Sequence, residues 1–184
     1  MKLSKRISVA LLSLLFSISS FAAHHENVVI GDVEMNEVEH SDAFKRMSKM
    51  VGKWEGKLTQ YTGAVIDTSS EFRIVSGGNT ITEALVEDGV EMLTTYSDKN
   101  GKMIVKHYCA LGTQPVFRTS EVSNNVVEVK LDESLSNYHP NHQSYVNSMK
   151  WSTDPSNKNL TVVDSTIYID GELRIQQSVI NRVN

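Results

Sequence analysis

The chain has 184 residues, 22 Asp plus Glu against 18 Lys plus Arg, a net charge of −4 and one Cys. Binding to nucleic acid or to an anionic membrane surface needs clustered basic residues, so this acidic balance argues against both partners. The length suits one domain that buries its own core, and a single Cys can form no internal disulfide.

The N-terminus has the three parts of a secretory signal peptide. Residues 1–6 are basic, residues 7–16 are apolar apart from small serines, and mostly small residues follow up to Ala23. The apolar run is shorter than the about 20 residues of a membrane-spanning helix, so we expect an exported protein, periplasmic or secreted, without stable membrane insertion. Small residues at Ser20 and Ala22 favour cleavage after Ala22. Removal of residues 1–22 leaves 15 basic against 22 acidic residues and a net charge of −7.

The mature chain would then begin with Ala23-His24-His25. A free amine followed by His at the third position can hold Cu(II) or Ni(II) in a square plane, and a polar end without metal is the alternative. The whole stretch over residues 23–40 is acidic and polar, shows no period and predicts a flexible segment.

A short amphipathic helix is predicted from Ser41. Phe44, Met47 and Met50 recur at spacings of three, and Gly52 ends the pattern. We expect this helix to pack across an open end of the domain that follows, and a surface helix without a capping role is the alternative.

From Gly52 onwards the apolar residues alternate with period two, and turn signals such as Asn100-Gly101 and Asp170-Gly171 separate the runs. The predicted strands are residues 53–61, 65–76, 80–86, 90–97, 102–110, 116–123, 126–131, 148–152, 160–170 and 172–182. Short strands joined by tight turns predict one all-β domain over residues 41–184, an antiparallel up-and-down β-barrel of about ten strands whose closure leaves no free edge. The connection over residues 132–147 is longer than usual, so it is either functional or partly structured.

The Asn100-Gly101 pair predicts a two-residue hairpin turn, because both residues tolerate a positive φ. Such a turn places Tyr96 opposite Val105, Thr94 opposite His107 and Met92 opposite Cys109. These residues therefore share one face of the hairpin. Cys109 is then either a buried, inert side chain or an accessible thiol.

The side chains that alternation turns inward are of two kinds. The apolar ones include Trp54, Leu58, Ile66, Phe72, Ile74, Val127, Val129, Leu131, Met149 and Trp151. The polar ones are more numerous than a solid core can supply with hydrogen-bond partners. A barrel of about ten strands is also wide enough to leave a lumen. We therefore expect a cavity for a small hydrophobic or amphipathic ligand. The candidate ligand-binding residues are Gln60, Ser70, Thr94, Tyr96, His107, Cys109 and Gln114.

His107 is either a satisfied core residue or a ligand contact. Its charge can change near neutral pH, so it can fix an anionic head group or ligate a metal. His139 and His142 in the long connection lack the third and fourth ligands of a metal site, so a loop at the barrel mouth is the preferred interpretation. No metal ligand is assigned, and the cofactor and oligomeric state stay open.

Three residues on the first and last strands of the predicted barrel resemble the signature of a known superfamily. Gly52 and Trp54 on the first strand and Arg182 on the last are similar to the Gly-x-Trp and C-terminal Arg of lipocalin-like (calycin) barrels. The resemblance implies that Trp54 seals one end of the barrel and that Arg182 lies over its ring in a cation–π contact.

A second resemblance covers about residues 46–184. Trp54-Glu55-Gly56 and the run from His107-Tyr108-Cys109 to Gly112-Thr113-Gln114-Pro115 resemble an exported bacterial family of unknown function, which is typically written with Trp-Glu-Gly, His-Tyr-Cys and Gly-Asn-Gln-Pro. The chain has His142-Gln143-Ser144 where that family often has His-Met-His, and it lacks the family's Trp at residues 164–169. The resemblance therefore implies a barrel and a site near His107, without a later His or Trp.

Signatures of enzymes are mostly absent. The chain has no Gly-x-Ser-x-Gly, no His-Glu-x-x-His and no glycine-rich phosphate or dinucleotide loop. His107 and Cys109 lie two apart on one strand, about 6 to 7 Å from each other, which is too far for a nucleophile and its base. No catalytic residue is assigned, and ligand binding is the preferred function. The alternatives are an enzyme that uses His107 in the cavity and a structural or interaction module with a filled core.

Overall fold

The computed structural model describes residues 28–35 and 38–183. The predicted signal peptide over residues 1–22 and the Ala23-His24-His25 motif lie outside the described residues. Within the described ranges, no helix is long and apolar enough to cross a membrane.

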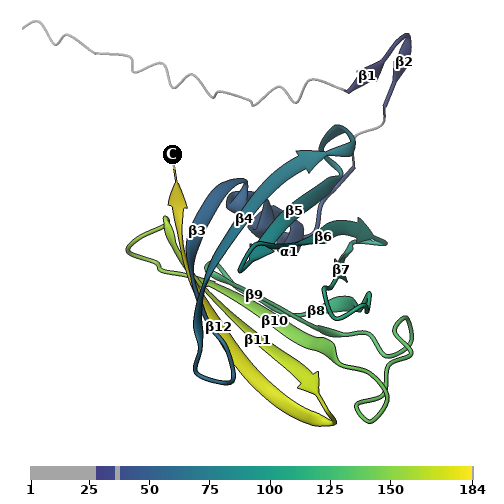
Figure 1. The fold of residues 1–184 in the computed structure, drawn as a ribbon. Coiled ribbons are helices and arrows are strands. Elements are labelled where there is room, and N and C mark those ends of the chain that lie inside the picture. Colours follow the sequence, from purple (N-terminus) through teal and green to yellow (C-terminus); the bar gives the residue numbers. More distant parts are fainter. Residues whose placement is uncertain (1–27, 36–37, 184) are drawn as a thin grey trace, which may run out of the picture. The chain divides into compact units, whose positions relative to one another are not determined.

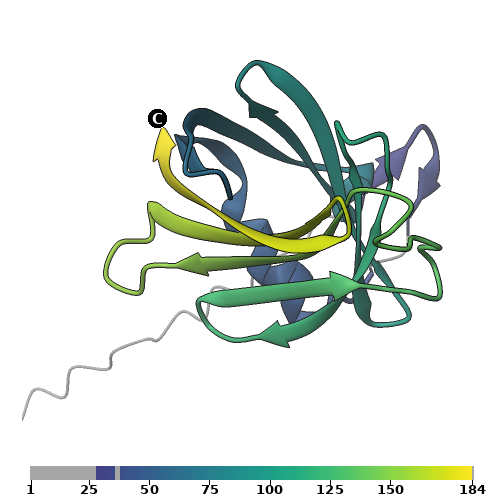
Figure 2. The ribbon, with the colours of Figure 1, turned by 60° about the horizontal axis from the view of Figure 1, so that its bottom comes forward.

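Ten antiparallel strands form a closed barrel, in which each strand pairs with its neighbours in the chain and the last strand pairs with the first (Figure 1). The strands are β3 (Gly52–Thr59), β4 (Val65–Val75), β5 (Thr80–Glu87), β6 (Val90–Lys99), β7 (Lys102–Tyr108), β8 (Val116–Val122), β9 (Val126–Leu131), β10 (Tyr145–Thr153), β11 (Leu160–Ile169) and β12 (Glu172–Val183). Figure 2 shows the strands following one another round the barrel. The predicted all-β up-and-down barrel is confirmed.

One predicted strand begins too late. β10 starts at Tyr145 rather than at Ser148, and its pairing with β11 shifts between Val146 and Ser148. The shift is a β-bulge, which breaks the alternation of inward and outward side chains and so hides the first part of the strand from a period-two pattern.

A separate small hairpin lies in the segment for which the sequence shows no period. It consists of β1 (Val29–Ile30) and β2 (Val33–Glu34), which pair antiparallel through a turn at Gly31.

Three two-residue turns set which side chains point into the barrel. Asp88-Gly89, Asn100-Gly101 and Asp170-Gly171 each have positive φ at both residues. This conformation matches the twist of the flanking strands. The predicted pairs follow, with Tyr96 opposite Val105 and Thr94 opposite His107.

The helix α1 (Asp42–Met47) and the turn η1 (Ser48–Met50) cover one end of the barrel. α1 contacts β6, β7, β8 and β9. Phe44, Met47 and Met50 are each at most 2% exposed and belong to the same hydrophobic core as Trp54. The predicted packing across an open end is therefore present. We call this the helix side of the barrel, and the opposite end, where β3 ends and β4 begins, the loop side.

Trp54 and Arg182 close the helix side. The Arg182 guanidinium lies 4.4 Å from the centre of the Trp54 ring and donates to the carbonyl oxygen of Lys49 at 2.6 Å. The indole Nε1 of Trp54 donates to the carbonyl oxygen of Met50 at 2.6 Å. Gly52 has φ +119°, and a Cβ there would lie 2.8 Å from Arg182 Nη1. The contact implied by the calycin resemblance is thus present.

Ile74 is a correction to the predicted inward set. Its side chain is 46% exposed. The pairing of β4 with β3 ends at Phe72, so Ile74 has a neighbouring strand on one side only and extends past the barrel wall.

Candidate ligand site in the barrel interior

The two halves of the barrel interior are packed differently. On the helix side, large side chains fill the space, and those that are at most 3% exposed include Trp54, Phe72, Tyr96, Met103, Phe117 and Trp151. On the loop side, Leu58, Val146 and Ile167 are at most 7% exposed, but other inward-facing residues are only half-buried, and they include Ile66, Leu85, Glu87, Met92, Ser165, Gln176 and Ser178. The inner surface of the loop-side half is therefore covered only in part by the chain's own side chains.

A buried carboxylate lies where the two halves meet. Glu83 on β5 is 5% exposed. Its Oε1 accepts a hydrogen bond from Ser70 Oγ at 2.7 Å, and its Oε2 accepts one from the Tyr96 hydroxyl. The Tyr96 ring in turn packs edge-on against Trp151, with ring centres 5.7 Å apart. Glu83 is thus anchored from β4 and β6 and rests on the aromatic core.

His107 continues this polar arrangement on β7. Its Nδ1 lies 2.9 Å from Thr94 Oγ1, and its backbone N–H donates to the carbonyl oxygen of Pro115. The residue is 3% exposed, and Nε2 has no hydrogen-bond partner within the part of the chain that the structure describes. We call Ser70, Glu83, Thr94, Tyr96 and His107 the interior network.

Burial governs the charge states in the interior network. Desolvation lowers the pKa of His107 to about 4, so the imidazole is neutral at pH 7. Burial raises the pKa of Glu83, while hydrogen bonds from Tyr96 and Ser70 act in the opposite direction. Burial also raises the pKa of Glu87, and the charge of Glu83 adds to that rise.

Cys109 and Gln114 lie apart from the interior network. They line a recess of about 190 Å³ at the loop-side rim, together with Glu91, Tyr108, Ala110, Gly112 and Thr113. Cys109 follows the end of β7, and the pairing of β6 with β7 reaches only Leu93 and Tyr108, one pair short of the expected Met92 and Cys109. Burial raises the pKa of the Cys109 thiol, which disfavours the nucleophilic thiolate.

Gln60 also lies outside the interior network. It follows the last residue of β3, and its backbone N–H donates to the carbonyl oxygen of Ala64 at 2.8 Å in the β3–β4 turn. Thus Ser70, Thr94, Tyr96 and His107 come together. Gln60 and Gln114 lie outside this network, and Cys109 lines the rim recess but also packs against the hydrophobic core. Whether any of them contacts a ligand stays a prediction.

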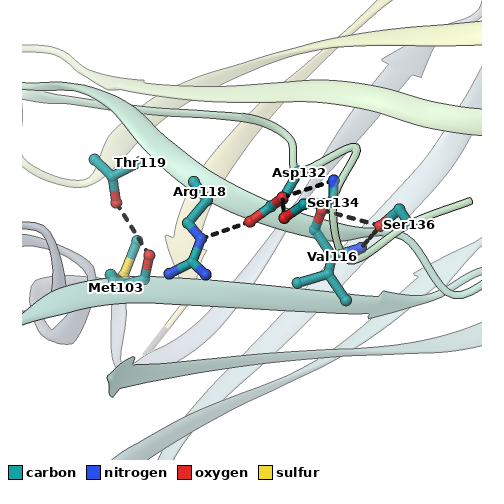
Figure 3. Close-up of polar contacts among 7 residues, drawn as sticks. All are labelled: Met103, Val116, Arg118, Thr119, Asp132, Ser134 and Ser136. Carbon is teal, nitrogen blue, oxygen red and sulfur yellow. Dashed lines mark hydrogen bonds and ion pairs between the residues drawn. The ribbon is translucent and has the colours of Figure 1, made fainter. Parts of the chain in front are cut away.

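The long connection from β9 to β10 is held against β8 (Figure 3). Asp132 Oδ2 accepts from Arg118 Nε at 2.6 Å, and Asp132 Oδ1 accepts from the backbone N–H of Ser134 at 3.0 Å. Ser136 Oγ accepts from the backbone N–H of Val116 at 2.8 Å. The first half of the connection is therefore structured.

The second half of the connection lies at the rim. The Tyr138 hydroxyl accepts from the backbone N–H of Gln114 at 2.7 Å, and its ring stacks on Tyr145. The rings of His139 and His142 are 5.2 Å apart. Within the described residues, no group of three or more His, Cys, Asp or Glu side chains is placed to hold a metal.

Glu83 and Glu87 are the residues that the sequence analysis missed. The sequence contains a pattern that places these two residues, because Asp88-Gly89 is the same kind of two-residue hairpin turn as Asn100-Gly101. Applied to β5 and β6, the pairing rule places Glu83 opposite Thr94, on the inward face, as observed. A carboxylate at an inward position between apolar residues is uncommon enough to mark a site.

Comparisons with known proteins give no family and two distant structural similarities. No family model matches the sequence. No curated protein matches it. Among solved structures, a redesigned β-barrel, b11L5F_LGL, is 12% identical with a TM-score of 0.38 and covers 80% of this chain and 100% of its own. The structure of EF1p2_mFAP2b bound to DFHBI is 10% identical with a TM-score of 0.42 and covers 77% of this chain and 99% of its own. Both similarities concern the barrel fold, and neither assigns a ligand to this chain.

Proposed function

We propose that the protein binds a small hydrophobic or amphipathic molecule in the loop-side half of the barrel. The observation that supports this proposal is the interior network at the base of an inner surface that the chain's own side chains cover only in part. Apolar walls with a few fixed polar groups are the usual composition of a small-molecule site.

The pattern of burial supports binding over a filled structural core. In a filled barrel, inward residues in the middle of a strand are fully buried, as they are on the helix side. On the loop side, Ser165 and Ser178 lie in mid-strand and face inward but remain half-buried. Nε2 of His107 adds a polar atom without a hydrogen-bond partner among the described residues, so it is available to another molecule.

A matched pair of substitutions on β12 tests the location. Ser178→Phe places a ring inside the barrel, whereas Val179→Phe places one outside, at a position that is already 40% exposed. We expect titration with the neutral fluorescent probe N-phenylnaphthylamine to show binding by the wild type and by Val179→Phe, and its loss in Ser178→Phe. Unchanged binding by a folded Ser178→Phe would place the probe elsewhere and contradict the proposal.

We also propose that the protein meets its ligand after export. The basic, apolar and small-residue sequence of residues 1–22 supports export, with cleavage after Ala22. Mass spectrometry of the secreted or periplasmic protein is expected to give a mature chain that begins at Ala23. A mature chain that still begins at Met1 would contradict this proposal.

A further inference from the structure

The charged residues that face the barrel interior are unevenly distributed. By alternation from Trp54, Ser70, Glu83 and Thr94, the charged residues of the described strands that face inward are the acids Glu83, Glu87, Asp98 and Glu172 and the bases Arg174 and Arg182. The two arginines lie at opposite ends of β12, so the middle of the interior holds acids and no Lys or Arg.

The groups at the two ends are already engaged. Arg182 is stacked on Trp54 at the helix side. Asp98 accepts hydrogen bonds from the backbone N–H and hydroxyl of Ser41, at 2.6 and 2.7 Å. Arg174 at the loop side is paired with Glu172 and lies 5.7 Å from the ring centre of Tyr61. Glu83 and Glu87 have no ion-pair partner among the described residues.

The imidazole of His107 supplies no positive charge either. Its burial keeps it neutral at pH 7, as described above. Thr94 Oγ1 lies 2.9 Å from Nδ1 of His107. With Thr94 as the acceptor in this bond, the lone pair lies on Nε2, and His107 offers the interior an acceptor rather than a donor.

We propose that the ligand of this barrel is an amphipathic amine, whose ammonium group donates a hydrogen bond to Glu87 and whose apolar part lies along Leu85 and Met92. This inference rests on the proposed function and names the chemical class of its ligand. It disfavours the anionic head group that was one option for His107, because a carboxylate here would meet two acids and no cation. In a poorly hydrated interior such repulsion is strong, and an ammonium ion relieves it.

Three molecules with the same alkyl tail test the inference on the full chain. A straight-chain amine, alcohol and carboxylate, each below its micelle-forming concentration, compete with N-phenylnaphthylamine at pH 7. We expect the amine to bind at least about tenfold more tightly than the carboxylate, as measured by displacement of the probe, and the alcohol to lie between them. A tenfold difference in affinity corresponds to about 1.4 kcal/mol.

Two controls assign the preference to the interior. Glu87→Gln is expected to reduce the ratio of amine to carboxylate affinity, whereas Glu91→Gln, on the outer face at the rim recess, leaves it unchanged. The whole chain is acidic, so an amine also meets a negative outer surface. Ser178→Phe therefore completes the set, because it is expected to abolish amine binding without changing the net charge.

Each outcome decides a separate claim. A carboxylate that binds as tightly as the amine, while Ser178→Phe abolishes both, overturns the ligand class and leaves the proposed function in place. Equal loss of the amine preference in Glu87→Gln and Glu91→Gln places the amine at the outer surface and also overturns it. Failure of all three molecules to bind, together with an unaltered probe signal in Ser178→Phe, overturns both proposals.

Discussion

At the scale of single residues, the barrel combines an apolar core with a small set of buried polar atoms whose partners are specific. Glu83 is the centre of this set, because each of its two oxygens has its own donor. A buried polar group is inexpensive while its hydrogen bonds are made and costly when one partner is removed. The interior network therefore makes stability sensitive to changes of one atom.

Tyr96→Phe removes one hydroxyl and leaves the ring in place. Glu83 Oε2 then loses its donor in a buried site, and we expect the free energy of unfolding to fall by about 1 to 3 kcal/mol. Urea denaturation followed by circular dichroism measures this loss. Tyr108→Phe, at an exposed tyrosine on the outer face, is the control and should lie within about 0.5 kcal/mol of the wild type. Equal stability of both variants would show that the hydroxyl bond to Glu83 contributes nothing.

The lowered pKa of His107 predicts that the free energy of unfolding falls in acid. Its pKa is about 4 in the folded chain and 6.5 in the unfolded chain, so between these values the unfolded chain binds more protons. The contribution of the neutral imidazole to stability is complete above pH 6.5 and disappears as the pH falls through 4. The free energy of unfolding falls by about 3 kcal/mol over this window, because each pKa unit corresponds to about 1.4 kcal/mol.

Urea midpoints from neutral pH down to about 4 test this for the wild type and His107→Gln. Glu83 and Glu87, with raised pKa values, act in the opposite direction, so the informative quantity is the difference between the two proteins. We expect the advantage of the wild type to shrink as pH falls. The exposed His139→Gln is the matched control, and a wild-type advantage that does not depend on pH would contradict the assignment.

At the scale of elements, α1 is too short to be stable by itself and is held by its ends. Ser41 accepts from the backbone N–H of Phe44 at 3.2 Å and donates to Asp98 at 2.7 Å, which ties the start of the helix to β6. The other end passes through η1 into Trp54 and Arg182. The helix is therefore part of the barrel's closed end.

Ser41→Ala removes the helix cap and the hydroxyl bond to Asp98, while the bond from the Ser41 backbone N–H to Asp98 remains. We expect it to lower the free energy of unfolding by about 1 to 2 kcal/mol. Ser48→Ala is the control, because the Ser48 hydroxyl bonds only to the carbonyl oxygen of Lys45 within the same exposed turn. Urea denaturation of the two variants side by side measures the difference, and an equal effect of both would show that the link to β6 adds no stability.

Gly56 marks the closest approach of two strands. A Cβ at this position would lie 1.9 Å from the carbonyl oxygen of Val179 on β12, so Gly56→Ala forces the backbone apart. We expect a loss of about 3 kcal/mol or more in urea denaturation. Gly63→Ala serves as the control, because a Cβ at Gly63 would meet no atom within 4 Å and only the positive φ of +86° disfavours a side chain. We expect this control to lose about 1 to 2 kcal/mol of unfolding free energy. A smaller loss for Gly56→Ala than for Gly63→Ala would contradict the close approach.

At the scale of the whole molecule, closure is what protects the strands. Because β12 pairs with both β11 and β3, every strand of the barrel has two neighbours. An open sheet of this length would expose a long edge that pairs with other chains.

A chain that ends at Asp170 lacks β12 and leaves two edges. We expect it to aggregate or to stay unfolded, as judged by size-exclusion chromatography and circular dichroism. A chain that begins at Glu37 keeps every strand of the barrel and is expected to unfold within about 0.5 kcal/mol of the full chain. A folded monomer after removal of β12 would show that closure is dispensable.

Much of this fold is predictable from turns and alternation. Asn100-Gly101 alone determines that Thr94 faces His107, because the turn fixes the register and the register fixes the face. The limit appears where alternation breaks. The bulge between Val146 and Ser148 conceals the start of β10, and the pairing of β6 with β7 ends at Tyr108, one residue before Cys109, which no local pattern reveals.

From the sequence alone, alternation and turns determine the up-and-down order of the strands and the register of the hairpin at Asn100-Gly101, since these follow from residues close in the chain. The tertiary structure shows which polar residues meet inside the barrel. The bonds from Ser70 and Tyr96 to Glu83 join three strands, and the absence of a basic residue in mid-barrel among the described strands is visible only when all ten inward faces are assembled. Charge and burial at a site are properties of that assembly, and the proposed amine rests on them.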